Sequence, residues 1–515
     1  MTTNASRRGF IRGLAGVAAC AGGCRSLCGG QKIRLGVVGV WGKGFSDWLT
    51  MYKSGLVEIV AFCDADDDVQ TLVPAALRRK GVDLDFSRVP FYTDYRRLLD
   101  DAGILGLDAL TVSTPDHTHA AVAIRAMKMG LHVYVQKPLV RTLGELELFR
   151  RTAKEHGVVT QMGNQGSAHS GLRRSVEVIR TGIIGDVKEI HVWTNRPIWP
   201  QGAFAAKLVA GKEDPIPAGL NWQAWLGPVP YVKFKGALPP NTPGFDPRDP
   251  KRRFSDNVYH RFNWRGYFDF GCGAFGDMAC HTMNMPFRAC ELGAVDSAEC
   301  IQIDESTNVA FPLRSIVKLH YKARRSVYRP DVVLPAVDLY WYDGNQLPRA
   351  ELMPQVVAAL GAVPKTGCLI VGSKGIVCST NDYGGTGYLA LADEKKVQNM
   401  FFHPACRDIP FVLPRRSDVV DVVAQGPGAP AVELDGHYNE FLDAIRGVGP
   451  VFRDTKSRCF SDVDFSIPIM EGILVGVAAQ RLPSTKLRWD SATQRFDDPR
   501  ANAFVSYAVR KGFEF

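Results

Sequence analysis

Short apolar runs alternate with helical patterns over the first 160 residues. Strand-like runs occupy residues 32–39, 56–62, 109–112 and 132–135, and helical patterns occupy residues 45–54, 95–99 and 120–129. Strands that alternate with helices favour right-handed crossovers and a parallel sheet. We therefore predict an α/β fold that begins with a doubly wound, nucleotide-binding domain over residues 31–160.

The pattern changes beyond residue 163. The segment 193–264 holds five of the nine tryptophans and eleven of the 31 prolines. This is too much proline for regular elements and too many aromatic side chains for a flexible linker. Strand-like alternation returns at residues 314–321 and 337–342, and helical spacing follows at residues 438–446 and 467–479. We predict that residues 161–515 form a larger α+β domain with segment 193–264 as an insertion.

A glycine-rich turn follows the first predicted strand and opens the first predicted helix. It comprises Gly39, Val40, Trp41, Gly42, Lys43 and Gly44. Such a turn can hold a pyrophosphate with backbone N–H groups and the helix dipole, although an ordinary strand–turn–helix has the same pattern. Trp41 stands where the middle glycine of a dinucleotide turn is expected, which leaves the loop geometry open.

An acidic residue follows the second predicted strand at the place of a ribose-binding carboxylate. Asp64 stands 25 residues beyond Gly39, near the spacing of about 20 residues seen in dinucleotide folds. Three further acids occupy positions 66–68 and would repel a second phosphate on the ribose. The sequence therefore predicts NAD as the cofactor, with NADP less favoured.

The charge of the chain does not indicate a polyanionic partner. The 515 residues include 62 basic and 53 acidic side chains, for a formal charge of +9. Four arginines and no acid lie in the first thirty residues, so the remainder carries +5 and is nearly balanced. Because no basic helix or block of like charge occurs, we expect no nucleic-acid partner. No apolar run approaches the ~18–20 residues of a membrane-spanning helix, so we expect no membrane span.

Residues 1–30 have the layout of a twin-arginine export signal. Arg7 and Arg8 stand between a serine and Phe-Ile-Arg, and a short run of small, weakly apolar residues follows. Residues 17–20 also have the shape of a lipoprotein cleavage box, in which Cys20 would carry lipid; alternatively, Cys20 is only a small residue of the leader. We expect an exported protein, periplasmic or associated with the cell envelope.

Nine of the twelve cysteines lie beyond this leader. They form no Cys-x-x-Cys, and no cysteine and histidine group has zinc-ligand spacing. We expect buried thiols, no disulfide framework and no metal site.

Three further motifs follow in order along the chain. Residues 114–119 read Thr-Pro-Asp-His-Thr-His, residues 136–138 read Gln-Lys-Pro, and residues 277–281 have the form Asp-x-x-x-His. Their order and spacing resemble the glucose-fructose oxidoreductase and inositol dehydrogenase family (Gfo/Idh/MocA). Residues 161–165, 194–197 and 263–266 resemble the exported branch of that family. The resemblance covers nearly all of the chain beyond the leader.

The resemblance implies a Rossmann domain followed by a domain with an open, mostly antiparallel sheet that binds a sugar or polyol against the nicotinamide. It implies that Lys137, Asp277 and His281 flank the hydroxyl that is oxidised. It also implies that Thr114, Pro115 and His117 contact the cofactor together with Gln136 and Lys137. Gln136 stands where the family usually has glutamate, which removes a charge beside the lysine. A homo-oligomer through paired sheets is a further implication.

These residue types suit the oxidation of an alcohol. The hydroxyl loses a proton as its carbon gives hydride to a nicotinamide, and histidine is suited to accept that proton. Asp277 and His281 are four residues apart, so on a helix they share a face, where the carboxylate could orient the imidazole or bind a neighbouring hydroxyl. Lys137 would hold the developing alkoxide by its charge. The same pair could bind a metal, but a third ligand at known spacing is missing.

Aromatic and polar residues in and near the insertion are candidates for sugar recognition. Trp264 and other tryptophans could cover the C–H face of a sugar ring, although packing within the proline-rich segment is the commoner role for any one of them. Asn164, Arg196 and Arg265 could reach hydroxyl groups. His119 is as well explained as a helix-start residue satisfied by backbone.

Together these features predict an NAD(H)-dependent oxidoreductase that acts on a secondary hydroxyl of a sugar or glycoside. Because an exported enzyme finds no NAD pool outside the cytosol, we expect it to retain its cofactor and to reset it within each cycle. The hydride could pass to a second carbonyl substrate. It could instead return to the same sugar after a transient ketone has allowed cleavage of a glycosidic bond, which would make the protein an NAD-dependent glycosidase. A non-catalytic sugar- or nucleotide-binding envelope protein is the alternative from another class.

Overall fold

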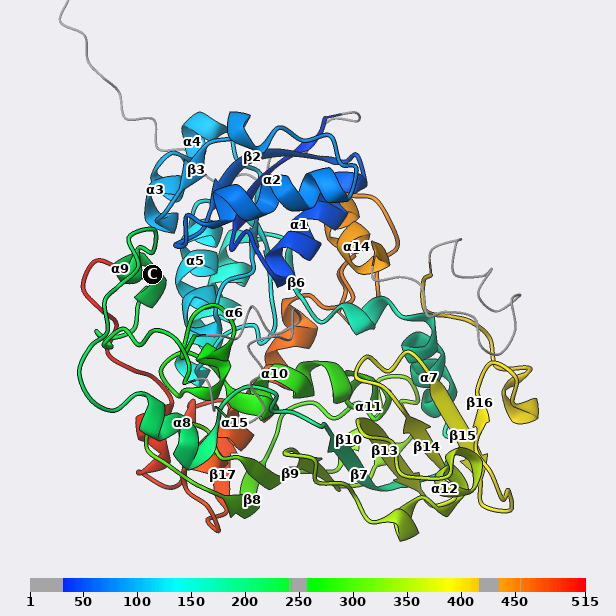
Figure 1. Ribbon diagram of the computed structural model, residues 1–515. Coiled ribbons are helices and arrows are strands. Elements are labelled where there is room, and N and C mark those ends of the chain that lie inside the picture. The colour runs from blue at the N-terminus through cyan, green and yellow to red at the C-terminus, as the bar shows by residue number, and fades with distance from the viewer. Residues whose placement is uncertain (1–30, 240–241, 243–256, 416–434, 454) are drawn as a thin grey trace, which may run out of the picture.

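Six parallel strands form the N-terminal sheet of the computed structural model, in the order β3-β2-β1-β4-β5-β6 (Figure 1). They are β1 (Ile33–Val38), β2 (Val57–Cys63), β3 (Phe91–Tyr92), β4 (Ala109–Val112), β5 (His132–Val135) and β6 (Thr160–Met162). All residues of β4 and β5 are buried, as expected for a parallel sheet that is covered on both faces. The predicted doubly wound sheet is confirmed.

The structure describes residues 31–239, 242, 257–415, 435–453 and 455–515. The predicted export signal and Cys20 therefore lie outside the described residues, as does part of the predicted insertion. All nine cysteines beyond residue 30 are buried and free.

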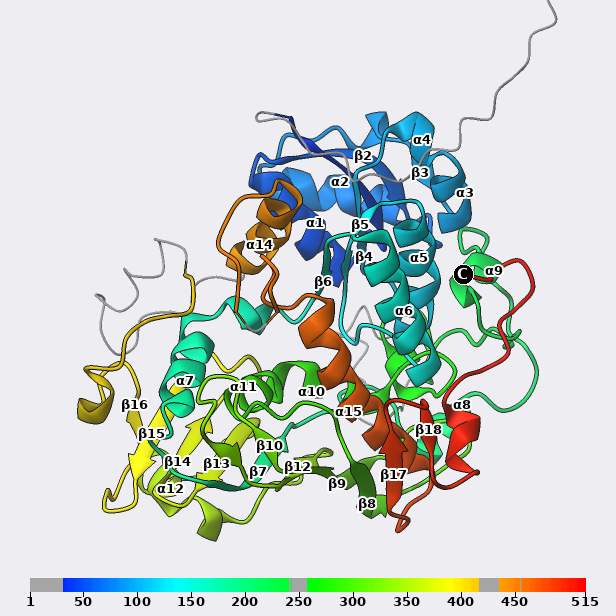
Figure 2. The ribbon, with the colours of Figure 1, turned by 180° about the vertical axis from the view of Figure 1, so that it is seen from behind.

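Helices cover both faces of the N-terminal sheet. They are α1 (Lys43–Lys53), α2 (Val69–Arg79), α3 (Tyr95–Asp100), α4 (Ala102–Leu105), α5 (Asp116–Lys128) and α6 (Leu143–His156). The apolar faces of α1 and α2 share one core with α14 (Asp435–Ile445), while α3, α5 and α6 pack on the opposite face. Helix α14 thus returns from the far end of the sequence and lies beside α1 (Figures 1 and 2).

The second sheet contains ten strands in the order β16-β15-β14-β13-β7-β12-β9-β8-β17-β18. They are β7 (Val187–Trp193), β8 (Ser297–Asp304), β9 (Arg314–Tyr321), β12 (Val337–Tyr342), β13 (Gly367–Gly372), β14 (Gly375–Ser379), β15 (Gly387–Leu391), β16 (Gln398–Asn399), β17 (Leu487–Asp490) and β18 (Arg495–Phe496). Only β7 and β12 pair in parallel; the other neighbours are antiparallel. A separate ribbon pairs β10 (Arg324–Arg325) with β11 (Val333–Leu334). The mostly antiparallel second sheet is also confirmed.

Helices of the second domain lie mainly between its sheet and the first domain (Figures 1 and 2). They are α7 (Ser170–Arg180), α10 (Gly273–Thr282), α11 (Asn284–Ala289) and α15 (Val463–Arg481), with the shorter α8 (Gly202–Leu208), α9 (Trp222–Leu226) and α12 (Pro354–Leu360) elsewhere. Helix α15 contacts α6, α10 and β8, and so joins the two domains. This arrangement brings α10, with its Asp-x-x-x-His pattern, beneath the carboxyl ends of the parallel strands.

Helix α15 corrects one expectation from the sequence. Among the described helices it is the one long and apolar enough, by length and composition, to cross a membrane. The sequence analysis expects no apolar run of that length, so this expectation is wrong for α15. The one glutamate within its apolar stretch, Glu471, accepts hydrogen bonds from Trp489 and Ser491. Since 72% of its apolar stretch is buried inside the protein, its packing is that of a core helix.

The insertion has an aromatic core of its own and docks on the first domain. Trp222, Trp225, Tyr259, Trp264 and Phe270 are all buried in this core. The chain between Gly219 and Asn221 runs along the loop after β2: Asp67 N donates to Gly219 O at 2.9 Å and Asn221 N donates to Ala65 O at 2.8 Å. The insertion therefore lies at the edge of the site formed by the parallel strands.

Candidate active site

A cavity of about 650 Å³ lies where the two domains meet. Loops after β1, β2, β4 and β5 line it on one side, and α10, the insertion and the loop at Tyr383 line it on the other. The volume lies within the ~300–1,000 Å³ range of small-molecule and cofactor sites. Of the predicted site residues, the cavity is lined by Gly39, Trp41, Gly42, Lys43, Asp64, Thr114, Pro115, Gln136, Lys137, Arg196, Trp264, Arg265, Asp277 and His281.

The glycine turn has the close approach that a dinucleotide turn requires. A Cβ atom on Gly44 would lie 1.9 Å from Gly39 O, and one on Gly39 would lie 2.5 Å from Ser113 O. Neither position can therefore carry a side chain without moving backbone. Gly44 itself is buried behind the turn, so its role is steric.

Trp41 does not obstruct the turn. Gly42, at a φ of 62°, caps the start of α1 and has open space around its Cα. The Trp41 ring turns against Phe45, with ring centroids 5.3 Å apart. Gly42 thus provides the flexible position of the turn, one residue after the position where the middle glycine is usually found. These residues fit a dinucleotide phosphate: the loop is narrow, glycine-lined and at a helix N-terminus.

Asp64 lies at the end of β2, as predicted for a ribose-binding acid. Its Oδ2 accepts from Val40 N at 2.8 Å, which ties the acid to the glycine turn. Burial raises its pKa, while the backbone donors Val40 and Asp66 act in the opposite direction.

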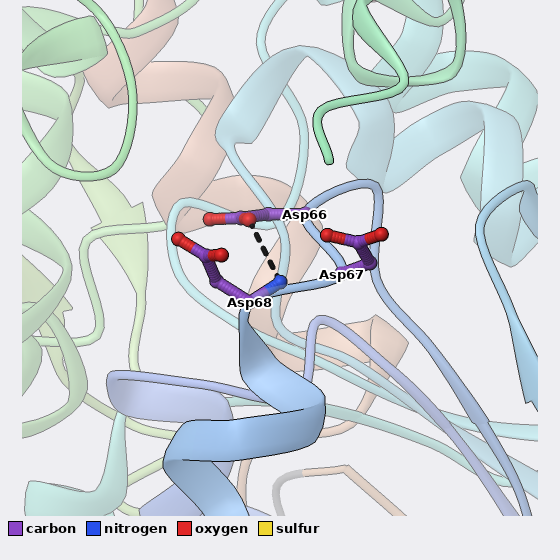
Figure 3. A group of neighbouring side chains, drawn as sticks. All are labelled: Asp66, Asp67 and Asp68. Atoms are coloured by element: carbon purple, nitrogen blue, oxygen red, sulfur yellow. Dashed lines mark hydrogen bonds between the residues drawn. The ribbon is translucent and has the colours of Figure 1, made fainter. Parts of the chain in front are cut away.

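The acids after Asp64 cluster at the start of α2, where Asp66 Oδ1 accepts from Asp68 N at 3.2 Å (Figure 3). Two residues of the insertion bind this cluster. Asp66 Oδ2 accepts from His260 Nε2 at 2.8 Å and from Arg261 Nε at 2.7 Å, and Arg261 Nη2 also donates to Asp68 at 2.8 Å. Burial would raise the pKa of Asp66, but His260 and Arg261 outweigh it and the pKa is lowered. Oxygens of Asp66, Asp67 and Asp68 lie within 4.8 Å of one another, yet the guanidinium already supplies the positive charge that this group needs.

The Thr-Pro loop after β4 contributes differently from what the sequence suggested. Thr114 and Pro115 line the cavity, but His117 does not. Its ring is fully buried between Trp225 and Phe270, with centroids 5.0 Å from each, and Nε2 bonds to Trp225 O at 2.8 Å. His117 therefore anchors the insertion and does not line the cavity. His119 lies between the carbonyls of Thr114 and Pro138, as the backbone-satisfied interpretation expects.

Lys137 and Asp277 meet across 140 residues of sequence. Lys137 Nζ donates to Asp277 Oδ1 at 2.8 Å and to Asp277 O at 3.0 Å, and Arg265 Nε donates to the same Oδ1 at 3.0 Å. Burial would raise the pKa of Asp277, but the two cations outweigh burial and hold the pKa below its usual range. The carboxylate is thus ionised and places two positive charges at the cavity wall.

His281 shares the α10 face with Asp277 but is not oriented by it. No hydrogen bond joins them, because Asp277 is engaged by Lys137 and Arg265. Nδ1 of His281 is buried and has no hydrogen-bond partner among the described residues, and its ring stands edge-on to Tyr383 at 4.9 Å. Burial, followed by the charge of Lys137, lowers its pKa well below the usual value. The imidazole is therefore neutral and retains a lone pair.

Asp116 was not singled out in the sequence and lies in the same cluster. It is 1% exposed and lines the cavity, and in the part of the chain that the structure describes no side chain hydrogen-bonds to its oxygens. Burial raises its pKa to about 8, although Arg265 and Lys137 favour its ionised form. The Thr-Pro-Asp pattern in the sequence could have drawn attention to Asp116, but the burial of Asp116 depends on α10 and the loop at Cys272.

The candidate substrate residues divide into two groups. Arg265 lies over the Trp264 ring at 4.2 Å, and Arg196 pairs with Asp382 at 3.4 Å. Both arginines and Trp264 line the cavity. Asn164 does not: it is fully buried, and Nδ2 donates to Cys280 O at 3.3 Å beneath α10. Asn164 therefore supports the helix that carries Asp277 and His281.

Comparisons with known proteins agree with the nucleotide-binding geometry. Residues 33–164 match a family model described as an oxidoreductase family with an NAD-binding Rossmann fold (GFO_IDH_MocA). A glycosyl hydrolase family 109 protein of Akkermansia muciniphila is 32% identical over 167 residues, which cover 30% of this chain and 32% of that protein. Inositol 2-dehydrogenase 1 of Saccharopolyspora erythraea is 28% identical over 164 residues, which cover 31% of this chain and 45% of that protein. The chain thus spans less than half the length of both relatives.

A solved structure shares the arrangement of both domains. It is an inositol dehydrogenase homolog from Azotobacter vinelandii, in complex with NADH and myo-inositol. The match covers 89% of this chain and 98% of that chain, with a TM-score of 0.54 and 14% sequence identity. At this identity the likeness establishes the fold.

Proposed function

We propose that the protein is an NAD(H)-dependent oxidoreductase of the Gfo/Idh/MocA family that acts on a secondary hydroxyl of a sugar or glycoside and retains its cofactor. The match of residues 33–164 to the family model supports this proposal. One observation carries the proposal. A single cavity is lined by the nucleotide-binding loops at one end and by Lys137, Asp277 and His281 at the other.

The nucleotide end of the cavity suits a dinucleotide. The glycine turn at residues 39–44 would hold the pyrophosphate, Asp64 would bind the adenosine ribose, and Thr114 and Pro115 would lie against the nicotinamide side. When bound, the nicotinamide accepts a hydride from the carbon that bears the hydroxyl.

The other end of the cavity suits an alcohol that loses a proton. Lys137 and Arg265 share one carboxylate, so the cluster of these three side chains has a net positive charge that stabilises an alkoxide oxygen. His281 is neutral and lines the cavity, so it accepts the hydroxyl proton. Trp264 and Trp199 give the wall apolar faces for sugar C–H groups.

The charges around the ribose support NAD over NADP. Asp64 lines the cavity at the end of β2, where its carboxylate would repel a 2′-phosphate. Arg261 also lines the cavity but is engaged by Asp66 and Asp68. A phosphate would have to displace those carboxylates to reach the guanidinium.

The docked insertion supports a retained cofactor. His260 and Arg261 hold the loop after β2, and the residues around Trp225 cover the same side of the cavity. Release of a dinucleotide would require these ion pairs and the backbone bonds at Gly219 and Asn221 to open. Retention suits the export that the leader at residues 1–30 predicts, because the twin-arginine route carries folded protein. Attachment through lipidated Cys20 and a homo-oligomer remain part of this proposal.

A redox-assisted glycosidase is the second candidate. It is favoured by the similarity to the glycosyl hydrolase family 109 protein, 32% over 167 residues. In that scheme the same oxidation would produce a transient keto sugar, loss of the proton next to the ketone would expel the aglycone, water would add to the resulting enone, and the ketone would then be reduced by the returning hydride. Lys137, Asp277 and His281 would serve both reactions.

Spectroscopy of the purified full-length protein tests the proposal. We expect nicotinamide to be released from the denatured protein, and the bound form to be reduced on addition of a sugar with formation of a keto sugar. Release of an aglycone from aryl glycosides, with the cofactor unchanged, would select the glycosidase. A protein that contains no nicotinamide and binds no added NAD would refute both candidates.

A matched pair of lysine variants tests the chemistry. Lys137→Met should keep the cofactor and lose turnover by about 100-fold or more, because it removes the charge beside the alkoxide. Lys154→Met, an exposed lysine paired with Asp464 outside the cavity, is the control and should retain activity. Full activity of Lys137→Met would exclude this lysine from the mechanism.

A further inference from the structure

One fully buried carboxylate lies behind the cofactor-facing loops. Asp47, on α1, is 0% exposed and does not line the cavity. Its Oδ1 accepts from Lys43 Nζ at 2.5 Å and Tyr438 Oη at 2.7 Å, and its Oδ2 accepts from Ser113 Oγ at 2.9 Å and Gln136 Nε2 at 2.9 Å. Four donors on two oxygens satisfy the hydrogen-bonding capacity of this buried carboxylate, which burial without such partners would make costly.

These four donors come from separate parts of the chain. Lys43 belongs to the glycine turn, Ser113 follows β4, Gln136 follows β5, and Tyr438 lies on α14. Lys43, Ser113 and Gln136 all line the cavity. Asp47 therefore connects the three loops that face the cofactor, and α14 supports the connection from outside. Lys43 and Tyr438 also bond to each other at 2.8 Å, which closes the network.

Asp47 also explains why an amide follows β5. Gln136 donates to Asp47 through Nε2, while its Oε1 accepts from Lys137 N at 3.3 Å. Glutamate at this position would place a second carboxylate 2.9 Å from Asp47 Oδ2, where like charges repel strongly. Gly163 leaves room for the amide, because a Cβ there would lie 2.6 Å from Gln136 Nε2. Of the two facing positions, 47 thus carries the acid and 136 carries the amide.

We propose that Asp47 is a positioning residue that sets the arrangement of Lys43 at the glycine turn and, through Gln136, of Lys137 at the reaction centre. The proposal rests on the proposed function for its catalytic part, since it assumes that Lys137 acts on substrate. Its binding part concerns the dinucleotide alone. Asp47 and Gln136 act as one unit in which a single negative charge is required.

Moving the carboxylate from position 47 to position 136 tests whether Asp47 and Gln136 act together. Asp47→Asn should weaken NAD binding and lower kcat, each by about tenfold, because Lys43 loses its counter-ion and the amide at 136 loses its acceptor. Gln136→Glu should lose at least as much through repulsion. Asp47→Asn combined with Gln136→Glu restores one charge and one donor–acceptor pair, and should recover both quantities to within about threefold of wild type.

Asp343→Asn is the matched control for loss of a buried aspartate. Asp343 is 1% exposed and is bonded to Ser315 and Trp341 in the second sheet, and it does not line the cavity. Its loss should lower the melting temperature and leave the NAD dissociation constant within about twofold. Tyr438→Phe removes one donor without touching the cavity and should raise that constant about threefold if Asp47→Asn does not fold.

The outcomes separate the two proposals. Wild-type protein that binds no NAD overturns the proposed function. Wild type that binds NAD while Asp47→Asn and Tyr438→Phe bind it equally well overturns the role of Asp47. If the double variant binds NAD and turns over no better than the weaker of the two single variants, the claim that positions 47 and 136 share one negative charge is wrong.

Discussion

The buried carboxyl group of Asp116 allows an electrostatic contribution to the free energy of unfolding to be distinguished from a packing contribution. Asp116 begins α5 and is 1% exposed, beside Lys137, Arg265 and Asp277. Burial raises its pKa from 3.8 to about 8, so the native protein holds it protonated at neutral pH. Asp116→Asn keeps the shape of the protonated acid and removes the titration.

The magnitude follows from the two pKa values. Between pH 3.8 and about 8 the unfolded chain releases this proton while the native protein keeps it, so the stability that Asp116 contributes is complete below pH 3.8 and is lost as the pH rises toward 8. A tenfold difference in proton affinity is worth about 1.4 kcal/mol, which gives an upper limit of about 4 kcal/mol at neutral pH. Because water entry and local rearrangement reduce this cost, we expect about 2–4 kcal/mol.

The assay is the free energy of unfolding from urea titrations of wild type and Asp116→Asn between about pH 4 and pH 8. The variant should match wild type at the acid end and become more stable by about 2–4 kcal/mol at the alkaline end. Asp83→Asn, at an exposed position, controls for the loss of one carboxyl group and should give a difference that does not depend on pH. A difference between Asp116→Asn and wild type that is also independent of pH, or an Asn variant that is less stable at pH 8, would refute the reasoning.

Three further changes test other parts of the site. Gly44→Ala should reduce the affinity for NAD by about 100-fold or more while the protein still folds, because the added methyl group would lie 1.9 Å from Gly39 O. Isothermal titration calorimetry measures the loss, and an unchanged affinity would contradict the steric role of Gly44. Arg261→Met should speed the exchange of bound cofactor with labelled NAD by about tenfold, because it removes the ion pairs to Asp66 and Asp68. Equal exchange rates in the variant and wild type would show that the insertion does not retain the cofactor. His117→Phe should leave the affinity for NAD within about twofold and lower the melting temperature, since His117 Nε2 bonds to Trp225 O away from the cavity. A large loss of affinity would instead indicate that His117 contacts the cofactor.

Several features were readable from the sequence because they depend on neighbours along the chain. The alternation of strands and helices predicts the parallel sheet, and Gly39 through Gly44 with Asp64 predict the nucleotide end of the cavity. The i and i+4 spacing of Asp277 and His281 correctly places both on one face of α10. These are short-range patterns, in which backbone geometry alone sets the direction of each side chain.

The partners of those side chains were decided by the tertiary structure. Asp277 binds Lys137 and Arg265 instead of orienting His281, and His117 faces Trp225, 108 residues away. Arg261 neutralises acids that the sequence presents as a free negative cluster. A sequence lists charges and hydrogen-bonding groups, but burial and long-range packing determine which donor meets which acceptor and which proton stays bound. The kind of chemistry was therefore encoded locally, whereas the charge state of each group at the reaction centre depends on how the two domains and the insertion come together.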